Sequence, residues 1–129
     1  MLGNNDALAT IAVKDVKAAR KFYETTLGLA LDGGGEGPAL RFKSGNSKVL
    51  VYQSQFAGTN QATAATWVVD DIDAVVRDLK SKGVTFEHYD FPGVKREGDV
   101  HVMGALRNAW FKDPDGNILS IVNHGEMPA

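Results

Sequence analysis

A repeated pattern in the two halves of the sequence restricts the folds that this chain can adopt. Val13-Lys14-Asp15-Val16 follows a short apolar run and precedes a helical pattern, and Val69-Asp70-Asp71-Ile72 holds the equivalent place in the second half. The two segments match in pattern more than in identity. Repetition of this kind indicates one supersecondary unit that occurs twice. The sequence therefore predicts two similar halves, each with a strand, a helix and further strands.

The first half contains local signals for each of these elements. Residues 8–13 are short, apolar and partly β-branched, which is typical of a buried strand. Asp15 can cap a following helix, whose apolar side chains recur at three- and four-residue spacing until Gly28 ends it. Two more strands are expected near 39–43 and 48–53, after a turn-rich stretch.

The second half repeats this order. We expect a strand at 66–69, a helix that is capped by Asp71 and ends at Gly83, and a strand at 85–88. Residues 90–99 carry no clear periodicity and are predicted to be irregular. Loops of this length often form lids or binding loops, and the sequence leaves that role undecided for residues 90–104.

The last strand pair carries the strongest local signal in the chain. Residues 109–112 and 118–122 are apolar, and Asp113-Pro114-Asp115-Gly116-Asn117 separates them. Proline presets φ for a turn, glycine supplies a positive φ, and the aspartates can bond to nearby amides. The sequence therefore predicts a hairpin near the C-terminal end.

Composition excludes several classes of function. Hydrophobic residues make up 43% of the chain, enough for a real core, and 14 basic against 16 acidic residues give a net charge of −2. This balance, without a dense basic run, speaks against nucleic-acid and membrane partners. The chain has no cysteine, no secretion signal is visible, and no apolar run could span a bilayer. We expect a cytoplasmic protein.

Two motifs carry a family resemblance. Phe22-Tyr23-Glu24 with Leu27-Gly28-Leu29, and Phe111 through Asn117, resemble the vicinal oxygen chelate superfamily. That group includes glyoxalase I, bleomycin-resistance proteins, fosfomycin-resistance enzymes and extradiol dioxygenases. The resemblance covers about residues 7 to 123, and its motifs are structural, so they say little about a reaction.

The resemblance implies an α+β fold of two βαβββ modules, with a curved mixed sheet around a cleft and the helices on the outer face. Within a single domain at 1–129, we expect the following parts: module one at about 7–53, a linker at about 54–63, module two at about 64–123, and a tail at 124–129.

The resemblance also implies where a metal would be held. Family enzymes bind a divalent ion through histidine, glutamate or glutamine on the first and last strands of each module. Here those positions fall on Leu8, Ala64 and Ser120, and near Tyr52. Leucine and alanine have no donor atom, and a serine hydroxyl is a poor ligand for a transition metal. We therefore predict no family-type metal site and no cofactor.

Loss of the metal ligands predicts a mostly apolar cleft. Strand alternation, together with the residues after the long loop, gives the candidate lining of a ligand site. The candidates are Leu8, Thr10, Tyr52, Ala64, Thr66, His101, Arg107, Trp110 and Ser120. Such a cleft suits an apolar or aromatic ligand that a few polar groups orient.

Three functions remain open at this stage. The first is a metal-independent protein that binds or sequesters a small molecule, usually a homodimer in the bleomycin-resistance branch. The second is a lyase, isomerase or dioxygenase that uses displaced metal ligands or a metal-free acid and base. For that enzyme only Tyr52 and His101 are candidate acid–base groups, and no catalytic residue is assigned. The third is a regulatory or interaction domain with a vestigial cleft.

Overall fold

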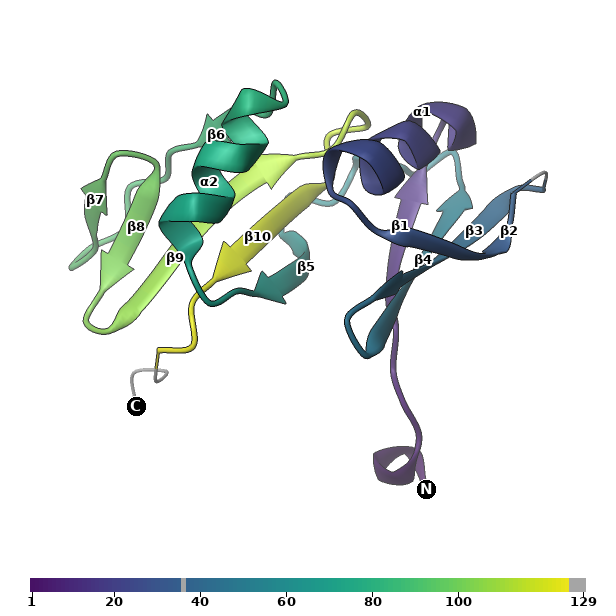
Figure 1. Ribbon diagram of the computed structural model, residues 1–129, viewed down its shortest axis with the longest axis horizontal. Coiled ribbons are helices and arrows are strands. Elements are labelled where there is room, and N and C mark those ends of the chain that lie inside the picture. Colours follow the sequence, from purple (N-terminus) through teal and green to yellow (C-terminus); the bar gives the residue numbers. More distant parts are fainter. Residues whose placement is uncertain (36, 126–129) are drawn as a thin grey trace. The chain divides into compact units, whose positions relative to one another are not determined.

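The computed structural model describes residues 1–35 and 37–125, and it divides into two compact units (Figure 1). One unit comprises Met1–Ala64 and Pro114–Asn117, and the other comprises Ala65–Asp113 and Ile118–Ala129. Residues 126–129 of the expected tail lie outside the described residues. The two units are described separately below.

The first unit is a four-stranded mixed sheet with one helix, as expected for a βαβββ module. Its strands follow the order β1-β4-β3-β2, in which β1 and β4 are parallel and the other pairs antiparallel. Its elements are η1 (Leu2–Asn4), β1 (Ala9–Val13), α1 (Val16–Arg20), η2 (Lys21–Thr26), β2 (Ala30–Gly34), β3 (Ala39–Ser44) and β4 (Ser47–Gln53).

The first helix begins and ends where the sequence predicts. The Asp15 carboxylate accepts hydrogen bonds from the backbone N–H groups of Lys17 (2.9 Å) and Ala18 (3.2 Å), which is the expected N-cap. The helical run continues from α1 into η2, a π-helical segment. Gly28 follows with φ of +80°. The buried Tyr23 ring contacts Phe42 of β3, so the helix packs on one face of this sheet.

Strand β2 belongs to the βαβββ pattern, but local sequence signals did not locate it, because Asp32 and its neighbouring glycines indicate turns. The structure pairs Leu31 with Phe42 and Gly33 with Arg41, and the register shifts between the two pairs. Gly34 then has φ of +82°, and a Cβ there would meet the carbonyl oxygen of Ala39. Glycines inside a strand often mark a bulge or a close backbone approach, and both occur here.

The second unit contains the second sheet, whose main strands follow the order β5-β10-β9-β8-β7, with β6 also paired to β9. Its elements are β5 (Thr63–Val68), α2 (Ile72–Ser81), β6 (Phe86–Glu87), β7 (Lys95–Glu97), β8 (Val100–Met103), β9 (Leu106–Lys112) and β10 (Ile118–Val122). The hairpin of β9 and β10 is the one that the sequence predicts. Helices and mixed strands in both units confirm the α+β fold.

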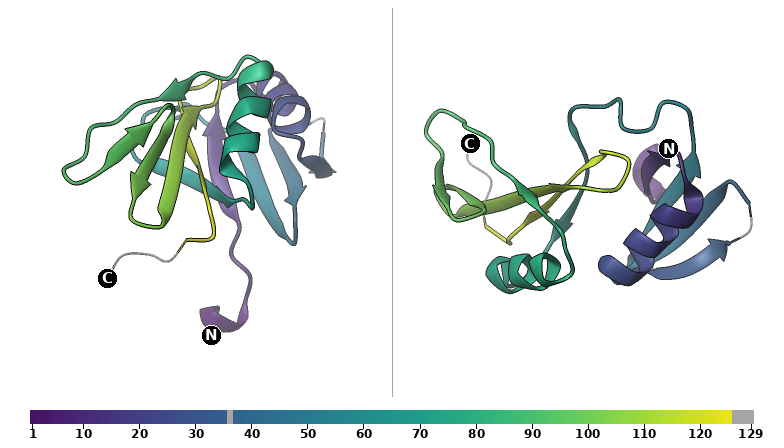
Figure 2. Two further views of the ribbon diagram at one scale, coloured as in Figure 1. Left: turned by 60° about the vertical axis from the view of Figure 1, so that its left-hand side comes forward. Right: turned by 90° about the horizontal axis from the view of Figure 1, so that it is seen from above.

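Helix α2 covers one face of the second sheet, as the view from above shows (Figure 2). Asp71 caps this helix by accepting a hydrogen bond from the backbone N–H of Ala74 at 3.1 Å. Its buried residues are Ile72, Val76 and Leu79. Alternation along β9 turns Ala109 and Phe111 into this core and turns Asn108 and Trp110 to the other face.

The stretch at 90–99 is only partly irregular, which corrects the expectation from sequence. Lys95 pairs with Val102 and Glu97 pairs with Val100, so β7 and β8 form a hairpin. All three residues of β7 are exposed. A short, charged strand on a sheet edge has no apolar alternation, and periodicity therefore did not reveal it.

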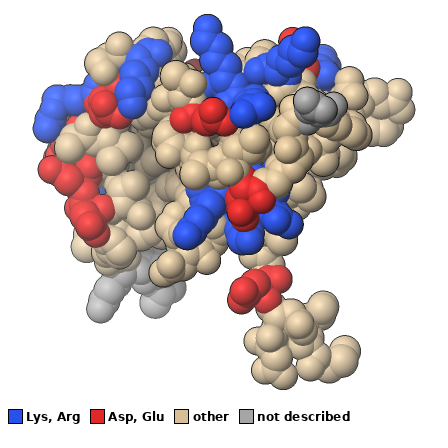
Figure 3. Space-filling model, turned by 45° about the vertical axis from the view of Figure 1, so that its right-hand side comes forward, with Lys and Arg blue, Asp and Glu red and all other residues tan. Residues whose placement is uncertain are grey.

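Basic and acidic side chains are interspersed on the face of the molecule seen in Figure 3. The structure also contains ion pairs between such side chains. Asp32, for example, lies 2.7 Å from the ammonium of Lys48 and 3.5 Å from Arg41. The hydrogen bond and charge of Lys48 hold the pKa of Asp32 below its usual value. No helix within the described residues is long and apolar enough to cross a membrane.

Candidate functional site

The helix-free face of the second sheet, opposite α2, carries a group of polar and aromatic side chains. Asn108 and Trp110 alternate with the core residues of β9 and therefore point to this face. His101 of β8 lies opposite Asn108, and Ser120 of β10 lies opposite Trp110. Directly opposed residues on antiparallel strands share a face, so three neighbouring strands contribute to the same surface.

A pocket of about 230 Å³ opens on this face. It is lined by residues from β8, β9 and the segment before β7: Phe91, Val94, His101, Met103, Leu106, Asn108 and Trp110. Most of these side chains are apolar, and the hydrogen-bonding groups among them belong to His101, Asn108 and the indole N–H of Trp110. We call it the aromatic pocket.

Three rings, those of Tyr89, Phe91 and Trp110, surround His101 and give the aromatic pocket its name. The Trp110 ring stands edge-on to His101, with 4.8 Å between ring centroids and an angle of 81°. Phe91 lies 5.7 Å from Trp110, and Tyr89 lies 5.4 Å from it. Edge-to-face and tilted contacts of this kind hold rings in defined positions. The pocket therefore has flat apolar walls formed by rings that contact one another.

Two buried polar atoms in the aromatic pocket have no hydrogen-bond partner among the described residues. They are Nδ1 of His101 and Oδ1 of Asn108. The other ring nitrogen of His101, Nε2, accepts a hydrogen bond from the backbone N–H of Tyr89 at 2.9 Å. Buried polar groups in proteins are nearly always paired, so two orphans side by side are unusual.

Two consecutive residues, His88 and Tyr89, hold the segment that carries Phe91 in place by hydrogen bonds. Besides the bond from Tyr89 to His101, His88 Nε2 lies 2.7 Å from the carboxylate of Asp99. Lys80 of α2 donates to the same carboxylate at 2.8 Å. Hydrogen bonds from Lys80 and then His88 lower the pKa of Asp99. One carboxylate thus joins α2, the pocket segment and the β7–β8 turn.

Arg107 lies away from the aromatic pocket, although the sequence placed it among the cleft residues. It neighbours Asn108 in β9 and therefore points to the face that α2 covers. Its guanidinium donates to Glu97 (3.0 Å) and to Asp73 of α2 (3.1 Å). The hydrogen bond to Glu97 and the charge of Asp73 raise the pKa of Arg107. Arg107 thus connects β9 to β7 and to α2.

The remaining expected cleft residues of the second sheet lie on its helix-free face. Thr66 Oγ1 and Ser120 Oγ share a hydrogen bond of 2.7 Å, which places these strands' side chains together. Ser120 is 1% exposed, whereas Thr66 is exposed. Ala64 is two residues before Thr66 in β5 and follows the same alternation.

Three expected cleft residues belong to the first unit. Leu8 comes just before β1, Thr10 lies within it, and Tyr52 lies in β4. Ile11 and Val51 are buried toward α1, so Thr10 and Tyr52 point to the helix-free face of the first sheet. Tyr52 is 39% exposed.

Sequence reasoning identified two residues of the aromatic pocket and missed five. His101 and Trp110 were expected, whereas Phe91, Val94, Met103, Leu106 and Asn108 were not. Apolar residues carry no chemical signal by themselves. Asn108, however, stands two residues before Trp110 in a predicted strand. Extending that strand by one residue would have placed Asn108 on the face of Trp110.

Three of the four positions that the resemblance assigns to a family metal offer few donor atoms. Leu8 and Ala64 offer no donor atom, and the Ser120 hydroxyl is already bonded to Thr66. Among residues 1–35 and 37–125, no group of three or more His, Asp or Glu side chains could hold a metal ion. Metal ions such as Zn²⁺ or Mn²⁺ need several converging donors.

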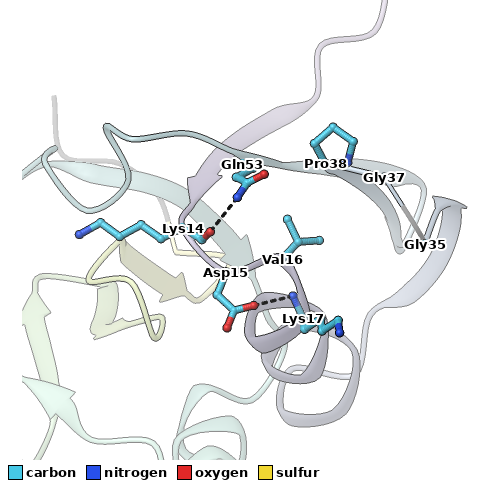
Figure 4. A pocket seen from close by; sticks show the side chains of 8 residues that line it. All are labelled: Lys14, Asp15, Val16, Lys17, Gly35, Gly37, Pro38 and Gln53. Atoms are coloured by element: carbon cyan, nitrogen blue, oxygen red, sulfur yellow. Dashed lines mark hydrogen bonds between the residues drawn. The ribbon is translucent and has the colours of Figure 1, made fainter.

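A wider hollow of about 670 Å³ lies in the first unit (Figure 4). It is lined by Lys14, Asp15, Val16, Lys17, Gly35, Gly37, Pro38 and Gln53. Asp15 is occupied as the N-cap of α1, and Gln53 donates to the carbonyl of Lys14 at 3.4 Å. Its polar side chains are thus engaged with backbone or exposed to solvent, unlike those of the aromatic pocket.

The chain belongs to the glyoxalase/bleomycin resistance protein/dioxygenase superfamily, whose family model matches residues 7–121. This confirms the resemblance that the two motifs indicated. No curated protein matches the chain.

Solved structures show the same fold at low sequence identity. A glyoxalase family protein from Enterococcus faecalis has a TM-score of 0.71 and 19% identity, covering 95% of this chain and 99% of its own. Lactoylglutathione lyase from Agrobacterium tumefaciens has a TM-score of 0.70 and 17% identity, covering 93% of each chain. TnmS3, an antibiotic binding protein from Streptomyces sp. CB03234, has a TM-score of 0.61 and 22% identity, covering 92% and 96%.

Proposed function

We propose that this protein binds an aromatic small molecule in the aromatic pocket of its second module. The observation that carries the proposal is a preformed pocket with aromatic walls, in which two buried polar atoms are unpaired. Ligand pockets are typically apolar with a few well-placed polar groups. At about 230 Å³, this one suits a ligand of one or two fused rings.

Binding without a metal ion is part of the proposal. The residues at the positions of the family's metal ligands support it, because Leu8 and Ala64 have no donor atoms and Ser120 is bonded to Thr66. Transfer of an aromatic ring from water to apolar walls is favourable by about 25 cal/mol per Å² of buried apolar surface. The pocket therefore needs no charged centre to hold such a ligand.

Two of the similar structures belong to proteins with different kinds of function, and they support different proposals. TnmS3 carries an antibiotic-binding function on this fold, whereas lactoylglutathione lyase carries an enzymatic one. Function follows the site and not the fold. An apolar pocket without a fitting metal set favours the binding function for this chain.

An NMR titration tests the proposal. The chain has two tryptophans, so the spectrum has two indole N–H signals, and 2-naphthol is the probe. We expect saturable shifts of the Trp110 indole and of the Phe91 and Asn108 amides, unchanged by EDTA, with Trp67 as internal reference. Trp110→Ala should abolish binding. Absence of saturable shifts, or binding that EDTA removes, would refute the proposal.

We also propose that the protein is a cytoplasmic homodimer. The absence of cysteine and the family resemblance support this. Sedimentation equilibrium should give twice the chain mass of 13.9 kDa. A single species of 13.9 kDa at high concentration would contradict the dimer.

A further inference from the structure

The protonation of His101 is set by the backbone. Its Nε2 accepts a hydrogen bond from the Tyr89 N–H, and a backbone N–H can only donate. Nε2 therefore carries no proton, and the neutral ring carries its proton on Nδ1. His101 is 3% exposed, and Nδ1 has no partner among the described residues. The aromatic pocket thus contains one buried hydrogen-bond donor that is not used.

An unused acceptor lies beside this donor. Asn108 is the cross-strand neighbour of His101, on the same face of adjacent strands. Its Oδ1 is buried and has no partner within the described part of the chain. Opposed residues on paired strands have Cβ atoms about 5 Å apart. A donor and an acceptor that both lack partners therefore share one end of the pocket.

We propose that this pair selects a neutral hydroxyl group on an aromatic ligand, an inference that rests on the proposed function. One hydroxyl satisfies both atoms, because its oxygen accepts from His101 Nδ1–H and its hydrogen is donated to Asn108 Oδ1. An ether oxygen satisfies only the histidine. A carboxylate or phenolate accepts from the histidine but faces the asparagine oxygen with a like partial charge. The ligand class is hydroxylated arenes, such as phenols and naphthols.

The aromatic walls favour the same class. Phe91 and Trp110 provide flat apolar surfaces around the polar pair. An aliphatic alcohol would bond to the same two atoms but would gain less contact with these rings. A ring that carries one hydroxyl at its edge matches a pocket with apolar walls and one polar end.

Three probes of one shape test the inference on the wild-type protein. The first, 2-naphthol, can both donate and accept a hydrogen bond. The second, 2-methoxynaphthalene, can only accept one, and naphthalene can neither donate nor accept. We expect 2-naphthol to bind about thirtyfold more tightly than naphthalene, the effect of two ordinary hydrogen bonds, with 2-methoxynaphthalene closer to naphthalene. Calorimetry or the NMR titration gives the dissociation constants, measured at pH 7, where 2-naphthol is neutral.

Two variants assign the effect to Asn108. Asn108→Leu keeps the size of the side chain but removes the acceptor, so the preference for 2-naphthol over 2-methoxynaphthalene should disappear while naphthalene still binds. Asn108→Asp keeps an acceptor and should retain the preference. A hydroxyl preference that survives in Asn108→Leu would overturn the inference. Thermal melting of both variants shows that they are folded.

The outcomes separate this inference from the proposed function. Equal affinity of the wild-type protein for all three probes would leave aromatic binding intact and refute hydroxyl selection, as when a bound water satisfies the pair instead. Failure of all three probes to bind would refute both.

Discussion

The backbone N–H of Tyr89 donates to the Nε2 atom of His101 across 2.9 Å, and this bond fixes both partners. It holds the segment that carries Phe91 against β8, and it leaves the proton of His101 on Nδ1, inside the aromatic pocket. A single hydrogen bond therefore sets the position of one wall and the polarity of one end.

Replacement of His101 by phenylalanine should cost stability as well as binding. The Tyr89 N–H would lose its partner in a half-buried place, at a cost of about 1–3 kcal/mol in the free energy of unfolding. Urea denaturation measures that loss. The control is His124→Phe, which changes a histidine whose side chain is 64% exposed and should shift the same free energy by less than about 0.5 kcal/mol. Equal effects of the two variants would contradict this role of His101.

Asp99 should make stability depend on pH in the acid range. Its folded-state pKa lies below the ordinary value of 3.8, first because Lys80 and then because His88 donate to it. A carboxylate with a lowered pKa stabilises the folded state above its unfolded pKa, and that contribution is lost as the pH falls through the folded pKa. Asp99→Asn should therefore lower the melting temperature at pH 6.

The acid titration supplies the control for Asp99. The difference between wild type and Asp99→Asn should shrink as the pH falls below about 4 and the wild-type carboxyl takes up its proton. The control variant is Asp78→Asn, which removes an exposed carboxylate of α2 that pairs with Lys82. Its melting temperature should differ much less from that of the wild type at pH 6. A difference for Asp99→Asn that grows toward low pH would contradict a lowered pKa of the Asp99 carboxyl in the folded state.

The Thr66–Ser120 hydrogen bond should respond unequally to removal of its two partners. Thr66→Val leaves the hydroxyl of Ser120, a 1% exposed residue, without a partner, which costs about 1–3 kcal/mol. Ser120→Ala leaves the hydroxyl of an exposed threonine, which water can satisfy, and should cost about 1 kcal/mol or less. Urea denaturation of both variants tests the order. The reverse order would show that burial does not decide the cost.

Gly58 and Gly116 should differ in their tolerance of a methyl group. Both have positive φ, +73° and +89°, so alanine costs about 1–2 kcal/mol at either position. A Cβ at Gly58 would also meet the carbonyl of Asp115, whereas none of the described atoms lies within 4 Å of one at Gly116. Gly58→Ala should therefore lower the melting temperature further than Gly116→Ala. Equal melting temperatures would show that the backbone around Gly58 shifts to make room for the methyl group.

The fold was largely predictable because local signals and the repeat agreed. Asp15 and Asp71 cap the two helices as expected, and the turn at 113–117 joins the expected strands. The strands that escaped prediction lack the usual pattern. Strand β2 contains glycines at a bulge, and β7 is a charged edge strand that only its pairing with β8 defines.

The site was less predictable because pairing between strands decides it. Arg107 and Asn108 are adjacent in sequence, and only the register of β9 shows that one faces α2 and the other the pocket. Nor could the sequence show that the free nitrogen of His101 is Nδ1, since that follows from a contact with Tyr89. Chemistry at this level depends on the direction of single side chains.

Residues 114–117, in the turn of the last hairpin, belong to the first compact unit, where Asn117 donates to the carbonyl of Ala12 at 2.7 Å. The boundary of the repeat and the boundary of the compact units are therefore different. A gene cut between the two repeats would encode an N-terminal fragment without Asn117, the hydrogen-bond donor to Ala12. In the C-terminal fragment, the turn at 114–117 would lack the residues of the first unit that it packs with. The dependence is one-sided: the first compact unit needs residues 114–117 from the second half of the chain, whereas the second unit takes all its residues from that half.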